Sequence, residues 1–255
     1  MLQIGLAHRT RHLARALLCL ACLNLVTVSQ AAEPRELDHE TRVFKVSVDG
    51  KERGKCTMEI GSFDDGSEKM EIEAALTFDY KVYVYRYQSK GSEIWRDGHL
   101  AELDNAADMN KTKYQLKARN TSKGLLLSVD GKLSELPADV WVTSYWHMPE
   151  ALVQRLNPDR KSRVVQAGGT KSSGSTKPKV VSLLDSDKGL KLRGEIVRVG
   201  NEMLTIAGKR QACDHYKISG DVQVELWYDS THRLVRQQGV ESGHKTLLEL
   251  TQISK

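Results

Sequence analysis

The sequence has few of the patterns by which most enzymes and metalloproteins are identified. After residue 32 it contains no His-x-His, His-Glu-x-x-His or Cys-x-x-Cys spacing. A Gly-x-Ser-x-Gly nucleophile elbow is also missing. We therefore assign no catalytic residue, no metal ligand and no cofactor. A non-enzymatic protein is favoured over an enzyme.

Acidic residues are missing from the N-terminal segment, where none precedes Glu33. Three arginines there are followed by a largely apolar stretch at 16–28, which is too short to span a bilayer core of about 30 Å as a helix. Small residues then allow cleavage near Ala31 or Ala32. The pattern predicts a signal peptide at 1–32 and a periplasmic or secreted mature protein that is not transmembrane.

Cysteine is scarce as well. A lipoprotein anchored through Cys22 is the alternative to cleavage, although Cys19 stands where that signal normally has an aliphatic residue. Cleavage would leave Cys56 and Cys213, which an oxidising compartment allows to form one disulfide. A pair of buried free thiols is the other possibility, because sequence does not show how closely the two Cα atoms approach.

The net charge of +5 is concentrated in one segment. Between Arg155 and Lys179 there are seven basic residues and a single acid, Asp159, so the remainder of the mature chain is mildly acidic. Aromatic residues do not alternate with the basic ones, and we predict no nucleic-acid partner. The glycine- and serine-rich composition of the same segment predicts a flexible basic loop at about 157–179.

Hydrophobic residues recur with a period of two, which is typical of half-buried β-strands. The pattern predicts a hairpin of Phe44–Val48 and Cys56–Ile60, joined by a turn at Asp49-Gly50. It also predicts one long strand at 70–84, where apolar residues occupy eight alternate positions. Further strands are predicted at Ser92–Arg96, Leu100–Asp104, Lys113–Arg119, Leu125–Val129, Val180–Leu184, Leu190–Val199, Glu202–Ile206, His215–Ser219, Val222–Tyr228, Leu234–Gly239 and Thr246–Ile253.

One segment in the middle of the chain lacks this alternation. Pro137–Trp141 predicts a short helical turn, and Pro149–Leu156 predicts a short helix with proline in its first turn. About a dozen strands with two short helices predict an all-β fold. We expect residues 33–255 to form a single domain with one strongly curved antiparallel sheet, shaped as a barrel, half-barrel or clam.

Aromatic residues are few, at 6% of the chain, but several gather at particular places. The second face of the long strand at 70–84 becomes aromatic at Tyr83, and four aromatic residues cluster before Pro149. Such residues either plug a curved sheet as core or line an apolar pocket. The candidate ligand-binding residues are Tyr83, Tyr85, Trp95, Trp141, Tyr145, Trp146 and Trp227.

Several short motifs resemble those of a family of exported bacterial proteins known only as a domain of unknown function. The motifs are Tyr85-Arg86-Tyr87, Glu93-Ile94-Trp95-Arg96-Asp97-Gly98, Leu136-Pro137-Ala138-Asp139, Thr143-Ser144-Tyr145-Trp146, Leu183-Leu184-Asp185 and Leu226-Trp227-Tyr228-Asp229. The resemblance implies an all-β periplasmic domain without an established activity. The basic loop is longer than this family leads us to expect.

Three functional hypotheses remain. The leading one is an envelope β domain that binds an apolar or amphipathic ligand, such as a lipid or glycan, or an envelope protein. The second is a hydrolase of envelope glycan or lipid that uses dispersed acids and histidines, of which Asp229 and His215 are the test cases. The third is a purely structural interaction module. The sequence does not determine the oligomeric state.

Overall fold

The structure is a computed structural model that describes residues 33–80, 83–156, 177–241 and 243–255. The predicted signal peptide at 1–32 and most of the predicted basic loop lie outside these residues. Residues Pro34–Lys255 make up one compact unit. Among the described residues, none of the helices has the length and apolar character needed to cross a membrane.

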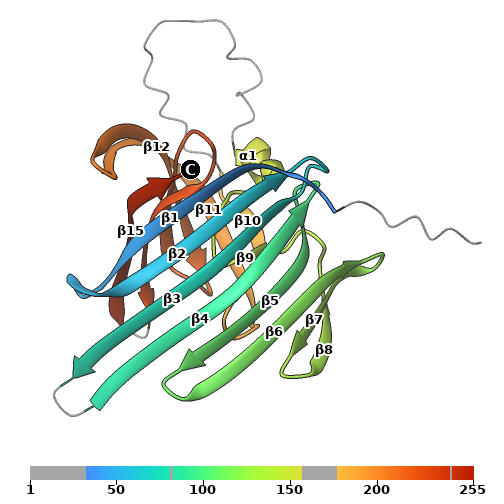
Figure 1. Cartoon of the computed structure of the whole chain (residues 1–255), viewed down its shortest axis with the longest axis horizontal. Coiled ribbons are helices and arrows are strands. Elements are labelled where there is room, and N and C mark those ends of the chain that lie inside the picture. The colour runs from blue at the N-terminus through green and yellow to red at the C-terminus, as the bar shows by residue number, and fades with distance from the viewer. Residues whose placement is uncertain (1–32, 81–82, 157–176, 242) are drawn as a thin grey trace, which may run out of the picture. The chain divides into compact units, whose positions relative to one another are not determined.

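Within the described residues of this unit there are fifteen strands and one helix, and the strands form a single sheet. Along the sheet the order is β8-β7-β6-β5-β4-β3-β2-β1-β15-β14-β13-β12-β11-β10-β9, so the first and last strands meet in its middle (Figure 1). The elements are β1 (Glu36–Val48), β2 (Lys51–Phe63), β3 (Glu68–Tyr80), β4 (Tyr83–Arg96), β5 (His99–Met109), β6 (Thr112–Thr121), β7 (Gly124–Val129), β8 (Lys132–Leu136), β9 (Trp141–Val142), α1 (Glu150–Leu156), β10 (Lys179–Leu184), β11 (Lys191–Ile206), β12 (Lys209–Gly220), β13 (Val224–Tyr228), β14 (Leu234–Glu241) and β15 (His244–Ser254).

The predicted all-β fold with a curved antiparallel sheet is confirmed, and the sheet is open, with β8 and β9 at its two edges. Neighbouring strands are antiparallel except β9 and β10, which are parallel. We call β1–β8 the N-terminal arm and β9–β15 the C-terminal arm. Side chains from both arms contribute to one buried cluster, including Phe44 and Met58 from the first and Ile196 and Leu226 from the second.

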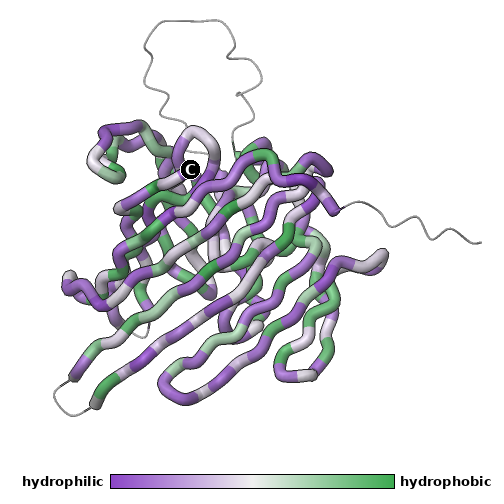
Figure 2. The backbone as a smooth tube through the Cα atoms, viewed as in Figure 1, coloured by the Kyte–Doolittle hydropathy of each residue, from purple (hydrophilic) through white to green (hydrophobic). Residues whose placement is uncertain are grey.

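Local sequence explains most of the hairpins. Hydrophobic and hydrophilic residues alternate along the long strands (Figure 2), and on β1 the side chains of Phe44 and Val46 are buried. Aspartate–glycine pairs form the tight turns because both residues adopt positive φ, as at Asp49 (φ 49°) and Gly50 (φ 75°). The same pairing closes the hairpins at Asp97-Gly98 and Asp130-Gly131, as predicted.

The predicted long strand at 70–84 is wrong, because the chain turns back within it. β3 ends at Tyr80, β4 begins at Tyr83, and these two residues are paired across the hairpin. Apolar residues at even positions run on into β4, which hides the turn, although a two-residue connection moves the inward-facing side from even positions on β3 to odd positions on β4. The segment predicted as a separate strand at Ser92–Arg96 is the second half of β4.

The middle of the chain contains one of its two predicted helices. The helix predicted at Pro149–Leu156 is confirmed as α1, which begins one residue later. The helical turn predicted at Pro137–Trp141 is wrong, because Trp141 and Val142 form β9 and pair with Leu183 and Leu184 of β10. Tertiary pairing with β10 outweighs the weak local preference of so short a segment.

A buried network of ion pairs joins β1 to the turn between β13 and β14. Arg42 lies 2.6 Å from Glu40 Oε1 and 2.7 Å from Asp229 Oδ2. Arg233 lies 3.0 Å from Glu40 Oε1 and 3.2 Å from Glu68 Oε1. Each of the three carboxylates therefore has a guanidinium partner. We call these five residues the ion network.

Candidate functional site

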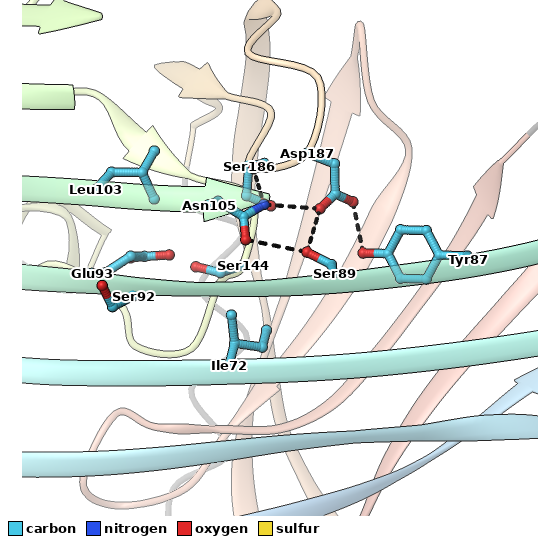
Figure 3. Close-up of a pocket in the computed structure, with 10 residues that line it drawn as sticks. All are labelled: Ile72, Tyr87, Ser89, Ser92, Glu93, Leu103, Asn105, Ser144, Ser186 and Asp187. Atoms are coloured by element: carbon cyan, nitrogen blue, oxygen red, sulfur yellow. Dashed lines mark hydrogen bonds between the residues drawn. The ribbon is translucent and has the colours of Figure 1, made fainter. Parts of the chain in front are cut away.

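A pocket of about 30 Å³ lies between β4, β5 and the loop from β10 to β11 (Figure 3). We call it the polar pocket because eight of its ten lining residues carry polar side chains. Since roughly 10–15 Å³ are enough for one water molecule, it holds one or two groups of that size. The lining residues are Ile72, Tyr87, Ser89, Ser92, Glu93, Leu103, Asn105, Ser144, Ser186 and Asp187.

Asp187 reaches this pocket from the C-terminal arm and is bound by three residues of the N-terminal arm. Its Oδ2 accepts a hydrogen bond from the Tyr87 hydroxyl at 2.8 Å. Its Oδ1 lies 3.0 Å from the Ser89 hydroxyl and 3.3 Å from Asn105 Nδ2. These contacts connect positions about 100 residues apart in the sequence, and Figure 3 shows them converging on one carboxylate.

The loop that carries Asp187 is shaped by hydrogen bonds between the Asp185 side chain and the backbone that follows it. Asp185 Oδ1 accepts hydrogen bonds from the backbone N–H groups of Asp187 at 2.9 Å and Lys188 at 2.8 Å. Gly189 follows with φ at 68°, and a Cβ atom there would collide with the Val129 side chain. The turn therefore lies tightly against the N-terminal arm and presents Asp187 to β4 and β5.

The second carboxylate of the pocket, Glu93 on β4, is only 2% exposed. Its Oε2 accepts hydrogen bonds from the indole N–H groups of Trp95 at 2.8 Å and Trp146 at 3.0 Å. The Ser144 hydroxyl also lines the pocket and contacts Glu93, and no described donor is bonded to its buried oxygen. No lysine, arginine or histidine is among the described residues that line the pocket.

Burial is the main influence on both carboxylates. It raises the pKa of Glu93, and the polar contacts of Ser144, Trp95 and Trp146 oppose that shift only in part. Burial likewise raises the pKa of Asp187, despite the hydrogen bonds from Tyr87 and Ser89. Both groups therefore hold a proton more strongly than a carboxylate in water, and a cation placed beside them would reverse the effect.

Space for the pocket depends on a glycine on β4. Gly91 pairs with Asn105 of β5, and a Cβ atom at Gly91 would collide with the Asn105 side chain. Asn105 is 3% exposed and donates from Nδ2 to the Ser186 carbonyl at 2.6 Å. The glycine thus allows a buried amide to bridge the two arms.

The pocket residues were missing from the candidates proposed on sequence grounds. A signal was nevertheless present, because Ser89 and Glu93 occupy the same parity as buried Trp95 on β4, and Asn105 that of Leu103 on β5. Polar residues at inward-facing positions mark either a hydrogen-bonded network or a site. Asp187 has no such signal because it lies in a loop.

Four of the aromatic candidates are buried in the core. Trp95 and Trp141 are 4% and 3% exposed, and Tyr145 and Trp146 are 3% and 1% exposed. Trp141 and Tyr145 pack edge to face at 4.9 Å between ring centroids, and the Tyr145 carbonyl accepts a bond from Tyr228. These positions favour the plug over the apolar pocket, although Trp95 and Trp146 support the polar pocket through Glu93.

The other three candidates lie elsewhere. Tyr85 on β4 stacks on Phe78 with centroids 4.7 Å apart, and the side chain of Tyr83 lies outside the described residues. Trp227 is sandwiched between the His215 ring, 4.2 Å away, and the Arg236 guanidinium, 5.0 Å away. The structure therefore does not bring the seven predicted residues together at one site.

The structure separates the two cysteines of the mature chain. Cys56 and Cys213 are both buried free thiols, the second of the two alternatives. Cys56 lies on β2 and Cys213 on β12, with four strands between them in the sheet order. Burial raises the pKa of Cys56 to about 12, with a smaller contribution from Asp187, so this thiol is unreactive at neutral pH.

The two residues named for a hydrolase have separate partners. Asp229 belongs to the ion network and also accepts a bond from the backbone N–H of Thr231 at 2.9 Å. His215 on β12 bonds to Glu225 at 2.9 Å. Neither lines the polar pocket, and the hydrolase hypothesis stays untested.

The open curved sheet defines a β-barrel-like protein, and comparison with known proteins places it in a family. The model of the family described as "Domain of unknown function (DUF6134)" matches residues 44–173. This chain belongs to that family, so the predicted resemblance to a family of unknown function is confirmed. No curated protein matches the chain.

Solved structures support the fold. A β-barrel-like protein of the domain of unknown function DUF1849 from Brucella abortus aligns with a TM-score of 0.60 and 8% identity, over 86% of this chain and 98% of that one. A DUF1089 family protein from Pseudomonas aeruginosa aligns at a TM-score of 0.37 and 10% identity, over 80% and 92% of the two chains. The second alignment is too loose to support an argument.

Proposed function

We propose that this protein is an exported β domain of the bacterial cell envelope that binds a ligand through the polar pocket. The observation that carries the proposal is the pair of buried carboxylates, Glu93 and Asp187, in a pocket that no cationic side chain among the described residues lines. Buried groups with shifted pKa values, located in a concavity, are typical of functional sites.

A purely structural role accounts less well for this arrangement. Transfer of a carboxylate from water to the protein interior costs free energy unless a partner compensates its charge. Asp187 is held by neutral donors alone, from Tyr87, Ser89 and Asn105. A ligand that supplies the missing charge or hydrogen bonds would offset that cost, and its binding would be selective for the same reason.

The size of the pocket restricts what enters it. About 30 Å³ accommodates one small polar group and not a sugar ring or an acyl chain. The pocket therefore receives one functional group of a larger molecule. This favours the amphipathic ligand over the apolar one, because the aromatic residues that an apolar ligand would need are packed in the core.

Export is supported by the N-terminal segment, in which arginines precede a short apolar stretch and small residues. Its test is the intact mass of the full chain expressed in a Gram-negative host and recovered from the periplasm. Loss of about the first 31 or 32 residues is the expected result. A full-length mass in the cytoplasm would contradict export, and a lipid-modified mass beginning at Cys22 would support the lipoprotein alternative.

Ligand binding is tested by native mass spectrometry of the mature protein after incubation with envelope extract. We expect a retained mass on the wild-type protein, its loss in Asp187→Asn, and its retention in the control Asp104→Asn. Asp104 lies next to Asn105 on β5 but is exposed and pairs with Lys117 at 2.7 Å. A bare wild-type mass, or equal retention by all three proteins, would contradict the proposal. Turnover of the extract would favour the hydrolase hypothesis.

A further inference from the structure

We propose that the polar pocket takes a primary ammonium group, either as a free amine or on the headgroup of a lipid. This inference rests on the proposed function, since it names the chemical group that the pocket receives. It is argued from the charge, the hydrogen-bond acceptors and the volume of the pocket.

The charge of the pocket calls for a cation. Glu93 and Asp187 are its two ionisable acids, and no described basic side chain lines it. Lys188 is next to Asp187 in the chain and attracts it electrostatically, but it does not line the pocket, and its ammonium group pairs with Glu241 at 3.5 Å. A bound ammonium would therefore be the first positive charge inside the pocket, and Coulomb attraction in a poorly solvated site strengthens its binding.

The acceptors match the three donors of a primary ammonium group. The carboxylates of Glu93 and Asp187 can accept from it, and both are buried. The Ser144 hydroxyl is the third acceptor, because its proton contacts Glu93 and no described donor is bonded to its buried oxygen. Figure 3 shows Ser144 and Glu93 at one end of the pocket and Asp187 at the other.

A metal ion fits this set of ligands less well. Within the described residues there is no group of three or more histidine, cysteine, aspartate or glutamate side chains that could hold one. Calcium requires six to eight oxygen ligands at about 2.3–2.6 Å, whereas Asp187 already uses its oxygens in bonds between the arms and Asn105 Oδ1 already accepts from Ser89. Directional N–H donors suit such partly occupied acceptors better than a bare cation does.

The volume separates primary from quaternary amines. A primary ammonium group is close to a water molecule in size, and about 30 Å³ accepts it. A trimethylammonium group has three additional carbon atoms around the nitrogen and offers no N–H donor. The pocket is therefore expected to discriminate ethanolamine from choline by both size and hydrogen bonding.

The experiment is isothermal titration of the mature protein at pH 8 with ethanolamine, choline, ethylene glycol and calcium chloride. Ethylene glycol has the size of ethanolamine without its charge. We expect ethanolamine to bind at least tenfold more tightly than any of the others. Glu93→Gln and Asp187→Asn should each weaken ethanolamine at least tenfold, while Asp104→Asn leaves it unchanged. Circular dichroism and thermal melting confirm that each variant is folded.

The source of the amine is tested with micelles of short-chain phosphatidylethanolamine and phosphatidylcholine. Binding of the first micelle alone, with weak free ethanolamine, assigns a lipid headgroup; equal binding of free ethanolamine assigns a free amine. Both results support the inference. Equal binding of ethanolamine and choline, stronger binding of calcium chloride, or no ethanolamine binding overturns it. If ethanolamine fails while envelope extract still yields a mass that Asp187→Asn loses, the proposed function stands without this inference.

Discussion

The described residues contain two buried clusters of charged residues, and the burial of the carboxylates is compensated differently in each. In the ion network, Glu40 and Asp229 each contact a guanidinium group within 3 Å. In the polar pocket, Glu93 and Asp187 are surrounded by hydroxyl, amide and indole donors instead. One cluster is neutralised by the chain itself and the other is not.

This difference appears in the pKa values. Burial raises the pKa of Asp229, but the charge of Arg42 and the hydrogen bond from Thr231 outweigh it, and the net pKa is lowered. No guanidinium opposes burial at Asp187, so its pKa is raised. Buried charges with internal partners thus stabilise the fold, whereas buried carboxylates without cationic partners beside a pocket indicate a site for something from outside.

The largest effect is expected from removing a cation of the ion network. Arg42→Met leaves Glu40 and Asp229 buried with a missing partner, and such a break costs about 3–5 kcal/mol. We expect this loss of unfolding free energy by urea denaturation at pH 7. The matched control is Lys117→Met, which removes one partner of the exposed pair with Asp104 and costs at most about 1 kcal/mol.

If Arg42→Met cost no more than Lys117→Met, the ion network would not hold β1 to the turn after β13. The cationic partners in the ion network would then contribute no more to stability than an exposed ion pair does. A protein too unstable to purify would leave the denaturation without a value, so the milder Glu68→Gln is measured in parallel. Glu68 is partly exposed and contacts Arg233 alone in this network, and about 1 kcal/mol is expected.

The fold was largely predictable because its determinants are local. Alternation identified most strands, and aspartate–glycine pairs identified several turns, since both follow from backbone geometry within a few residues. The turn between Tyr80 and Tyr83 was missed because apolar residues at even positions continue past it, even though the inward-facing positions change there from even to odd. The strand β9 was missed because Trp141 and Val142 are extended through pairing with Leu183 and Leu184.

The site was much less predictable. Aromatic residues such as Trp146 attract attention as ligand contacts, yet their hydrophobic area makes them core residues first. Ser89 and Asn105 were identifiable in principle as polar residues at inward-facing positions. Asp187 was not, because its contact with Ser89 spans 98 residues and depends on how the arms of the sheet meet.

The next effect is a pH dependence that belongs to the polar pocket alone. The folded pKa of Glu93 is raised, so folding keeps a proton that the unfolded chain releases above about pH 4.3. Its contribution is fully present below that pH and is lost as pH rises to the folded pKa, by up to about 1.4 kcal/mol per pH unit. Glu93→Gln removes this loss while keeping an acceptor for Trp95 and Trp146.

The measurement is urea denaturation of the wild type and Glu93→Gln at pH 4 and pH 8. The contacts that shift the Glu93 pKa come from Ser144, Trp95 and Trp146, none of which titrates in this range. Taking the difference between the two proteins removes the contributions of other groups. We expect the variant to gain stability relative to the wild type between pH 4 and pH 8. An unchanged difference would mean that Glu93 is ionised without cost.

The smallest effect is expected from Asp104→Asn, and its smallness sharpens the comparison. Asp104 follows Leu103 and precedes Asn105 on β5, but its side chain points to the exposed face, where it pairs with Lys117. An exposed pair contributes about 0–1 kcal/mol and is screened by salt. We expect a change below about 1 kcal/mol that disappears in 1 M salt. A larger, salt-insensitive loss would show that the outer face of β5 supports the pocket. Asp104→Asn would then no longer serve as a control for the charge of the pocket carboxylates.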